Sequence, residues 1–106
     1  MPAQELKTIG RRIAEELFSQ GDLAVADELF AAPDEVKRQV VDLRRALPDL
    51  YGHVETQVVE GDTLAQHVTF TDTTRRARFA MVHILRFGAD GRVAQLWSLT
   101  DRGAQP

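Results

Sequence analysis

The 106-residue sequence contains no cysteine, so it offers neither a disulfide framework nor a catalytic thiol. Its apolar runs are only a few residues long, well short of the roughly 20 residues that a membrane-spanning helix needs. The N-terminus lacks the apolar core of a signal peptide. The formal net charge is −3, and the arginines are interspersed with acids, so no basic surface for nucleic acid or an anionic membrane is indicated. These absences favour a cytoplasmic protein without nucleic-acid or membrane partners.

The remaining composition is that of an ordinary globular domain. Hydrophobic residues make up 43% and charged residues 27% of the chain, which argues against disorder. This length suffices for one hydrophobic core and is too short for two. We therefore expect a single domain over residues 1–106.

Apolar residues at helical spacing predict three helices in the first half of the chain. The first helix carries its apolar face on Leu6, Ile9, Ile13, Leu17 and Phe18. Gly21 is suited to end this helix in a left-handed cap, and Asp22 can cap the second helix through its carboxylate. A third helix is predicted to begin at Asp34 and to end before Pro48.

The pattern changes after Leu50 to strand-like runs separated by short turns. The predicted strands cover 54–60, 64–71, 77–87 and 92–100, with turns near Gly61, Thr73 and Gly91. Short connections imply antiparallel neighbours. The sequence therefore predicts an α+β fold, in which three N-terminal helices pack on a curved four-stranded antiparallel sheet.

The predicted strand 77–87 is apolar on both of its faces. Such a strand is buried on both sides, but three helices can cover only one face of the sheet. A second copy of the chain, stacked sheet to sheet, would cover the other face. We therefore expect a homodimer.

The last predicted strand carries Trp97 and, four residues later, Asp101. An even spacing places both side chains on one face of a regular strand. A large apolar ring beside one carboxylate is a common way to build a small-molecule pocket. In an apolar pocket, desolvation raises the pKa of a carboxylate and makes it a usable base. The alternative is that Asp101 is simply solvated at the end of its strand.

Several segments together resemble the SnoaL-like polyketide cyclases of the nuclear-transport-factor-2-like superfamily. They are Gly21-Asp22 with 26–29, Leu47-Pro48-Asp49-Leu50, Glu60-Gly61-Asp62, and the C-terminal stretch 86–101 with its Arg-Phe, Asp-Gly-Arg-Val and Trp-x-x-x-Asp. The resemblance implies a cystatin-like cone, and a cofactor-independent enzyme acting on a hydrophobic, polyketide-like or aromatic small molecule. It also implies that Asp101 is the general acid/base.

The chain departs from this family at two places. The strand and loop that commonly join the second and third helices are reduced to Ala31–Pro33, and the family's Gly-Thr-His segment is replaced by Asp72-Thr73-Thr74. The sequence thus resembles a trimmed member, whose pocket we expect to be smaller or more open.

The other candidate site residues follow from the strand pattern. His83 shares a strand face with Phe79 and Met81, where its imidazole could bind a substrate oxygen or orient Asp101; the alternative is an ordinary core histidine. Substrate contacts are expected from Trp97, Phe79, Met81, Tyr51 and Phe18. The histidines lack metal-ligand spacing, so no metal site is predicted.

Two functions remain open at this stage. One is an acid/base enzyme related to the cyclases, with Asp101 and His83 as catalytic residues. The other is a non-catalytic small-molecule-binding or dimerisation module on the same fold, because one fold serves many functions. An enclosed apolar setting for Asp101 would favour the enzyme, and an exposed one the module.

Overall fold

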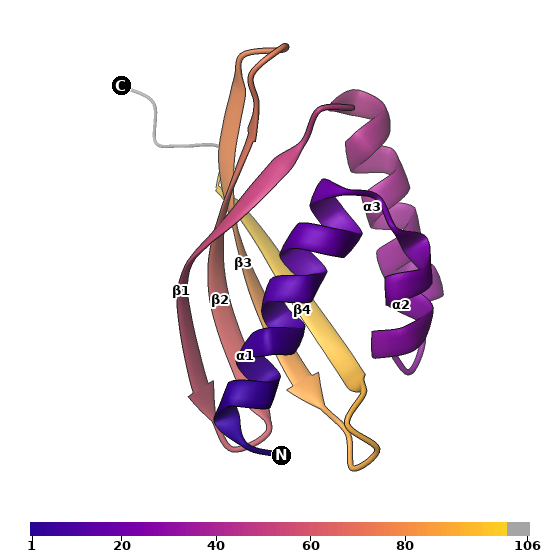
Figure 1. Cartoon of the computed structure of the whole chain (residues 1–106), viewed down its shortest axis with the longest axis vertical. Helices are drawn as coiled ribbons and strands as arrows, with labels where there is room; N and C mark the ends of the chain where they lie inside the picture. Colours follow the sequence, from indigo (N-terminus) through magenta and orange to yellow (C-terminus); the bar gives the residue numbers. More distant parts are fainter. Residues whose placement is uncertain (102–106) are drawn as a thin grey trace.

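The computed structural model describes residues 1–101, and its helices all lie on one side of a single sheet (Figure 1). The helical elements are α1 (Ala3–Arg12), the π-helix η1 (Ile13–Ser19), α2 (Leu23–Leu29) and α3 (Asp34–Ala46). The strands are β1 (Tyr51–Glu60), β2 (Thr63–Asp72), β3 (Ala77–Phe87) and β4 (Val93–Asp101). They pair antiparallel in the order β1-β2-β3-β4. The predicted fold class is confirmed.

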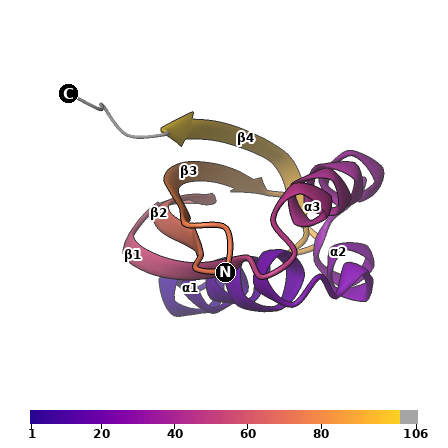
Figure 2. The same cartoon turned by 90° about the horizontal axis from the view of Figure 1, so that it is seen from above.

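The sheet is curved, and its inner face is packed against the helices (Figure 2). Among residues 1–101, no helix covers the outer face of the sheet. The core lies between this inner face and the helices. It contains side chains of β2 and β3, packed against the apolar face of α1 and η1: Leu64, Val68, Phe70, Met81, Leu85, Phe87, Leu6, Ile13, Leu17 and Phe18. These are the residues that the helical and strand periodicities place inward.

The second half of the predicted first helix is a π-helix. The hydroxyl of Ser19 donates to the carbonyl of Ala14, five residues earlier, at 2.8 Å and accepts from the backbone N–H of Gly52 at 2.8 Å. Arg44 of α3 donates to the carbonyls of Phe18 and Ser19 at the end of η1. Partners from the sheet and from α3 thus hold the end of this wider helix, and such segments often occur at functional sites.

Helix α1 lies unusually close to the sheet at Gly10. A Cβ atom there would lie 2.3 Å from Oε1 of Gln66 and 2.5 Å from Cδ2 of Leu64, so any larger residue would displace these side chains. Two glutamines of the sheet bond the α1 backbone: Nε2 of Gln66 donates to the Gly10 carbonyl at 3.0 Å, and Nε2 of Gln57 to the Lys7 carbonyl at 2.8 Å. These bonds fix the distance between α1 and the strands.

The helix end at Gly21 and the turns at Gly61 and Gly91 occur at the predicted positions. Gly21, Gly61 and Gly91 all have positive φ, and the Asp22 carboxylate accepts from the Ala24 N–H at 3.2 Å at the start of α2. Between α2 and α3, a single parallel bridge joins Phe30 to Val93, and the Ala31 N–H donates to the Val93 carbonyl at 3.0 Å. Beyond Val93, the outer edge of β4 has no strand partner within residues 1–101.

Within these residues, no helix combines the length and the apolar character that crossing a membrane requires.

Candidate functional site

A cavity of about 700 Å³ lies between α3 and the inner face of β3, and we call it the α3–β3 cavity. Its walls are mainly apolar: Leu43 and Ala46 from α3, Leu47 directly after this helix, and Phe79 and Met81 from β3. Phe79 and Met81 therefore line a cavity, as the sequence analysis predicted. Gln39 of α3 and Thr100 of β4 add neutral polar groups to its lining.

A second cavity of about 560 Å³, the α3–β4 cavity, lies along the outer edge of β4. It is lined by the N-terminal half of α3, by Phe30, and by the β4 residues from Val93 to Ser98. Gln39 lines this cavity as well.

His83 is fully buried on the inner face of β3, two residues from Met81. Its ring centroid lies 5.2 Å from that of Phe18 and 6.4 Å from that of Phe70. Neither Nδ1 nor Nε2 has a hydrogen-bond partner among residues 1–101. Burial lowers the pKa of the His83 imidazole to about 4, so the ring is neutral at physiological pH.

Ser98 lies directly opposite His83 in the register of β3 and β4. Its hydroxyl is also buried without a partner, although the residue lines the α3–β4 cavity. Thr100 lies opposite Met81 on the same inner face. Because most buried polar groups in proteins are hydrogen-bonded, the unpartnered atoms of His83 and Ser98 are suited to bind a ligand.

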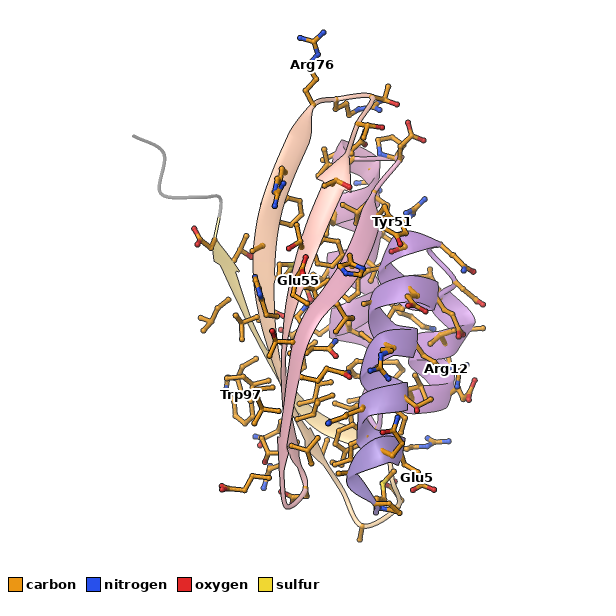
Figure 3. The ribbon with its side chains drawn as sticks, turned by 60° about the vertical axis from the view of Figure 1, so that its left-hand side comes forward. Glu5, Arg12, Tyr51, Glu55, Arg76 and Trp97 are labelled. Carbon is orange, nitrogen blue, oxygen red and sulfur yellow. The ribbon has the colours of Figure 1, made fainter. Side chains whose placement is uncertain are left out.

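Trp97 and Asp101 lie on the outer face of the sheet, opposite Ile84 and Ala80. They share a face, as predicted, and Figure 3 shows Trp97 projecting away from the helices. His83 points to the other face. The prediction that His83 orients Asp101 is therefore wrong, as is the one that Trp97 forms a common wall with Phe79 and Met81.

The physical reason is a β-bulge at the start of β4. Arg86 pairs with Gln95 but Phe87 pairs with Val93, so Ala94 is skipped. Counting in twos from the buried Val93 would place Trp97 and Asp101 inside. A one-residue irregularity moves every later side chain to the opposite face.

The other two predicted contact residues do not line either cavity. Tyr51 is 59% exposed at the start of β1 and pairs with Thr71, outside the cone. Phe18 is fully buried and packs against His83 from η1. No group of three metal-ligating side chains occurs within residues 1–101.

Sequence reasoning missed Gln39, Ser98 and Thr100. No local sequence pattern indicates that Gln39 lines a cavity, because its position next to the strands depends on the tertiary packing of α3. Ser98 and Thr100 lie on the face of β4 opposite to that of Trp97. A correct assignment of the inward-facing residues of β4 would therefore have included them.

Comparison with known proteins identifies the family. The family model of the SnoaL-like polyketide cyclases matches residues 3–105. A search of the curated proteins gives no significant match.

Solved structures share the fold at low sequence identity. A candidate polyketide cyclase from Acidithiobacillus ferrooxidans superposes with a TM-score of 0.82 at 19% identity, covering 96% of this chain and 92% of that one. TsrD from Streptomyces laurentii gives 0.78 at 18% identity, covering 95% and 91%. AclR from Streptomyces galilaeus, a candidate hydroxylase, gives 0.81 at 18% identity, covering 95% and 81%. With the family model matching almost its whole length, the chain belongs to the SnoaL-like polyketide cyclase family.

Proposed function

We propose that this protein is a small, cofactor-independent enzyme that binds a hydrophobic, polyketide-like or aromatic ketone between α3 and the strands β3 and β4. The observation that carries the proposal is a pair of buried polar side chains without hydrogen-bond partners among the described residues. They are His83 and Ser98, which lie opposite each other in β3 and β4, with Ser98 in the lining of the α3–β4 cavity. A ketone oxygen can accept from both, because a neutral imidazole has one N–H and serine has one O–H.

Acid/base chemistry at this site would be carried by His83. Hydrogen bonds from His83 and Ser98 to a carbonyl oxygen would stabilise the negative charge of an enolate. Polarising the carbonyl acidifies the neighbouring C–H, the step from which an aldol-type ring closure proceeds. The C–H proton would pass to the ring nitrogen of His83 that carries no hydrogen, and the imidazolium formed in this step would return the proton once the enolate has reacted.

The exposed position of Asp101 favours the second candidate function, a non-catalytic binding module. Asp101 lies on the other face of the sheet from His83. In that case, the groups of the inner face would bind the ketone without accelerating its chemistry. Binding and proton exchange, measured on the same ketone, separate the two functions.

The test uses 6-propionyl-2-dimethylaminonaphthalene, an aromatic ketone whose emission shifts to the blue in apolar surroundings. We expect saturable binding, and about three- to tenfold weaker binding by Ser98→Ala, which removes one hydrogen bond to the carbonyl. Thr56→Ala on the exposed side of β1 is the matched control. Faster deuterium uptake at the carbon next to the carbonyl would identify an enzyme, and binding without faster uptake a module.

Two outcomes would contradict this assignment. Absence of saturable binding would overturn the proposed site. Loss of deuterium uptake in Asp101→Asn, with ketone affinity and melting temperature unchanged, would assign the acid/base role to Asp101 instead of His83.

The outer face of the sheet supports a homodimer, which we propose as the assembled form. Four large apolar side chains are exposed there: Tyr51 (59%), Val58 (60%), Trp97 (49%) and Leu99 (62%). Between them, Val82 and Ile84 of β3 are only half-buried. Val58, Ala65, Ile84 and Trp97 pair in one row across the four strands, and Val82 and Leu99 pair in the next row. An apolar patch of this kind is typical of an interface, and a second copy could cover it by stacking its own outer face.

Leu99→Lys is expected to convert the dimer into a monomer, because the ammonium group would lose its hydration inside an apolar interface. Sedimentation velocity at micromolar concentration measures this change. Val41→Lys is the matched control, since Val41 is an exposed apolar residue of α3, 38% accessible. A parent chain that sediments as a monomer would contradict the proposal.

A further inference from the structure

The two cavities share one lining side chain of α3. Gln39 lines both of them, at the middle of the helix. Glu35 and Val36, one turn earlier, line only the α3–β4 cavity, and Leu43 and Leu47, one and two turns later, line only the α3–β3 cavity.

The residues of β4 that face α3 are divided between the two cavities in the same way. Ser98 lines the α3–β4 cavity and Thr100, the next residue on the inner face, lines the α3–β3 cavity. His83 lies opposite Ser98 in the register of β3 and β4. The two cavities, of about 560 and 700 Å³, therefore follow each other along α3 and β4, and we call them together the α3 groove.

The shortened connection between α2 and α3 leaves this groove open at its edge. In the described part of the chain, the bridge from Phe30 to Val93 is the only pairing along the outer edge of β4, and both residues line the α3–β4 cavity. Each cavity alone is as large as the pocket of a drug-sized ligand, about 300 to 1,000 Å³. A compact ligand would need only one of them.

The charged side chains of the lining belong to residues at the exposed mouths: Glu35, Asp42, Arg76 and Arg78. Figure 3 shows Arg76 at the tip of the turn between β2 and β3, extending away from the sheet. The rest of the lining is uncharged and combines apolar side chains with the neutral polar groups of Gln39, Gln95, Ser98 and Thr100. The groove therefore suits a ligand whose body is uncharged.

We propose that the ligand is an elongated, mostly apolar ketone that runs between α3 and β4 past Gln39, and that Gln39 determines how long it can be. This inference rests on the proposed function, because the carbonyl would lie at His83 and Ser98. The half-buried Gln39 side chain is flexible and uncharged, so it can turn aside for a chain that occupies both cavities.

A series of 6-acyl-2-dimethylaminonaphthalenes, from propionyl to lauroyl, tests the length dependence. In the parent protein, affinity should rise with acyl length by as much as about fourfold for each buried methylene. Gln39→Phe should block the passage and lower the affinity ratio of lauroyl to propionyl at least tenfold. Gln39→Ala should widen the passage and raise that ratio. Gln4→Phe, on the exposed side of α1, is the matched control.

The outcomes separate the two proposals. If the propionyl ketone does not bind the parent protein, the proposed function fails. If it binds but the ratio stays at the parent value in both Gln39 variants, the threaded groove is overturned and the proposed function stands. Should Gln39→Phe fail to fold, the Gln39→Ala ratio decides alone.

Discussion

His83→Leu should make the stability of the protein much less sensitive to acid. In the unfolded chain the imidazole has a pKa of about 6.5, whereas burial lowers it to about 4 in the fold. Between these pH values the unfolded state binds more protons, so the free energy of unfolding rises with pH. The parent protein should therefore lose up to about 3 kcal/mol from this residue as the pH falls from 6.5 to 4, and the leucine variant should not.

Urea unfolding of both proteins at several pH values in this range measures the difference. His53→Leu is the matched control, because His53 is exposed on β1 and should keep the parent slope. At neutral pH the leucine variant should be at least as stable as the parent, since it removes two buried nitrogens without partners. A leucine variant with the parent's acid sensitivity would show that His83 is hydrated or paired in solution.

The same variant links stability to function. Leucine cannot donate a hydrogen bond to a carbonyl oxygen, so ketone binding should weaken while the fold becomes more stable. His83 would then lower the stability of the fold while it contributes to ketone binding, as expected for a trade-off between stability and function. An ordinary core histidine would show the gain in stability without the loss of binding.

Local patterns were enough to predict the order of the elements. The apolar spacing of α1 and η1, the Asp22 cap and the turns at Gly61 and Gly91 all depend on residues close in sequence, and the structure confirms them. The spacing did not distinguish an α-helix from the π-helix at Ile13–Ser19. The bonds from Ser19 and Arg44 that hold its end come from the fold.

The composition of the site could not be predicted to the same degree. The inward direction of Phe79, Met81 and His83 follows from the alternation of β3. For β4, the bulge at Ala94 reverses the alternation, and neither alanine nor its neighbours carry a recognisable signal for it. The resemblance to the cyclases drew attention to Asp101, whereas the register brings Ser98 to His83.

The side of the cavity formed by α3 depends on tertiary packing. An amphipathic pattern shows which residues of α3 are buried, Val36 and Val40 among them. It does not show how far the helix lies from β4. The distance between α3 and β4 determines whether the strand covers Gln39 or whether Gln39 lines a cavity.

Phe70→Ala is expected to cause the largest loss of stability of any substitution considered. Phe70 is fully buried on the inner face of β2. Its ring stacks on Phe79 with centroids 5.4 Å apart and lies 5.7 Å from the ring of Phe18. Removing a buried phenylalanine ring costs about 3–5 kcal/mol through lost transfer energy and the cavity left behind. Urea unfolding at neutral pH measures this loss.

The cavity created by Phe70→Ala cannot collapse easily, because the elements around it are held by other contacts. Glutamines 57 and 66 fix α1 at Lys7 and Gly10, and the Ser19 hydroxyl fixes η1 at Gly52. A loss near the upper end of the range is therefore expected, which is a large part of the 5–15 kcal/mol that stabilises a typical domain.

Phe79→Ala is the informative control for this prediction. Phe79 stacks on Phe70 but is only half-buried, because its other side faces the α3–β3 cavity. Truncating it enlarges an existing cavity more than it opens a new one, so the loss of stability should be clearly smaller than for Phe70→Ala. The affinity for the naphthyl ketone, by contrast, should fall, because the ring is a wall of the proposed site. Equal losses of stability would mean that the ring of Phe79 is core and that the cavity beside it closes in solution.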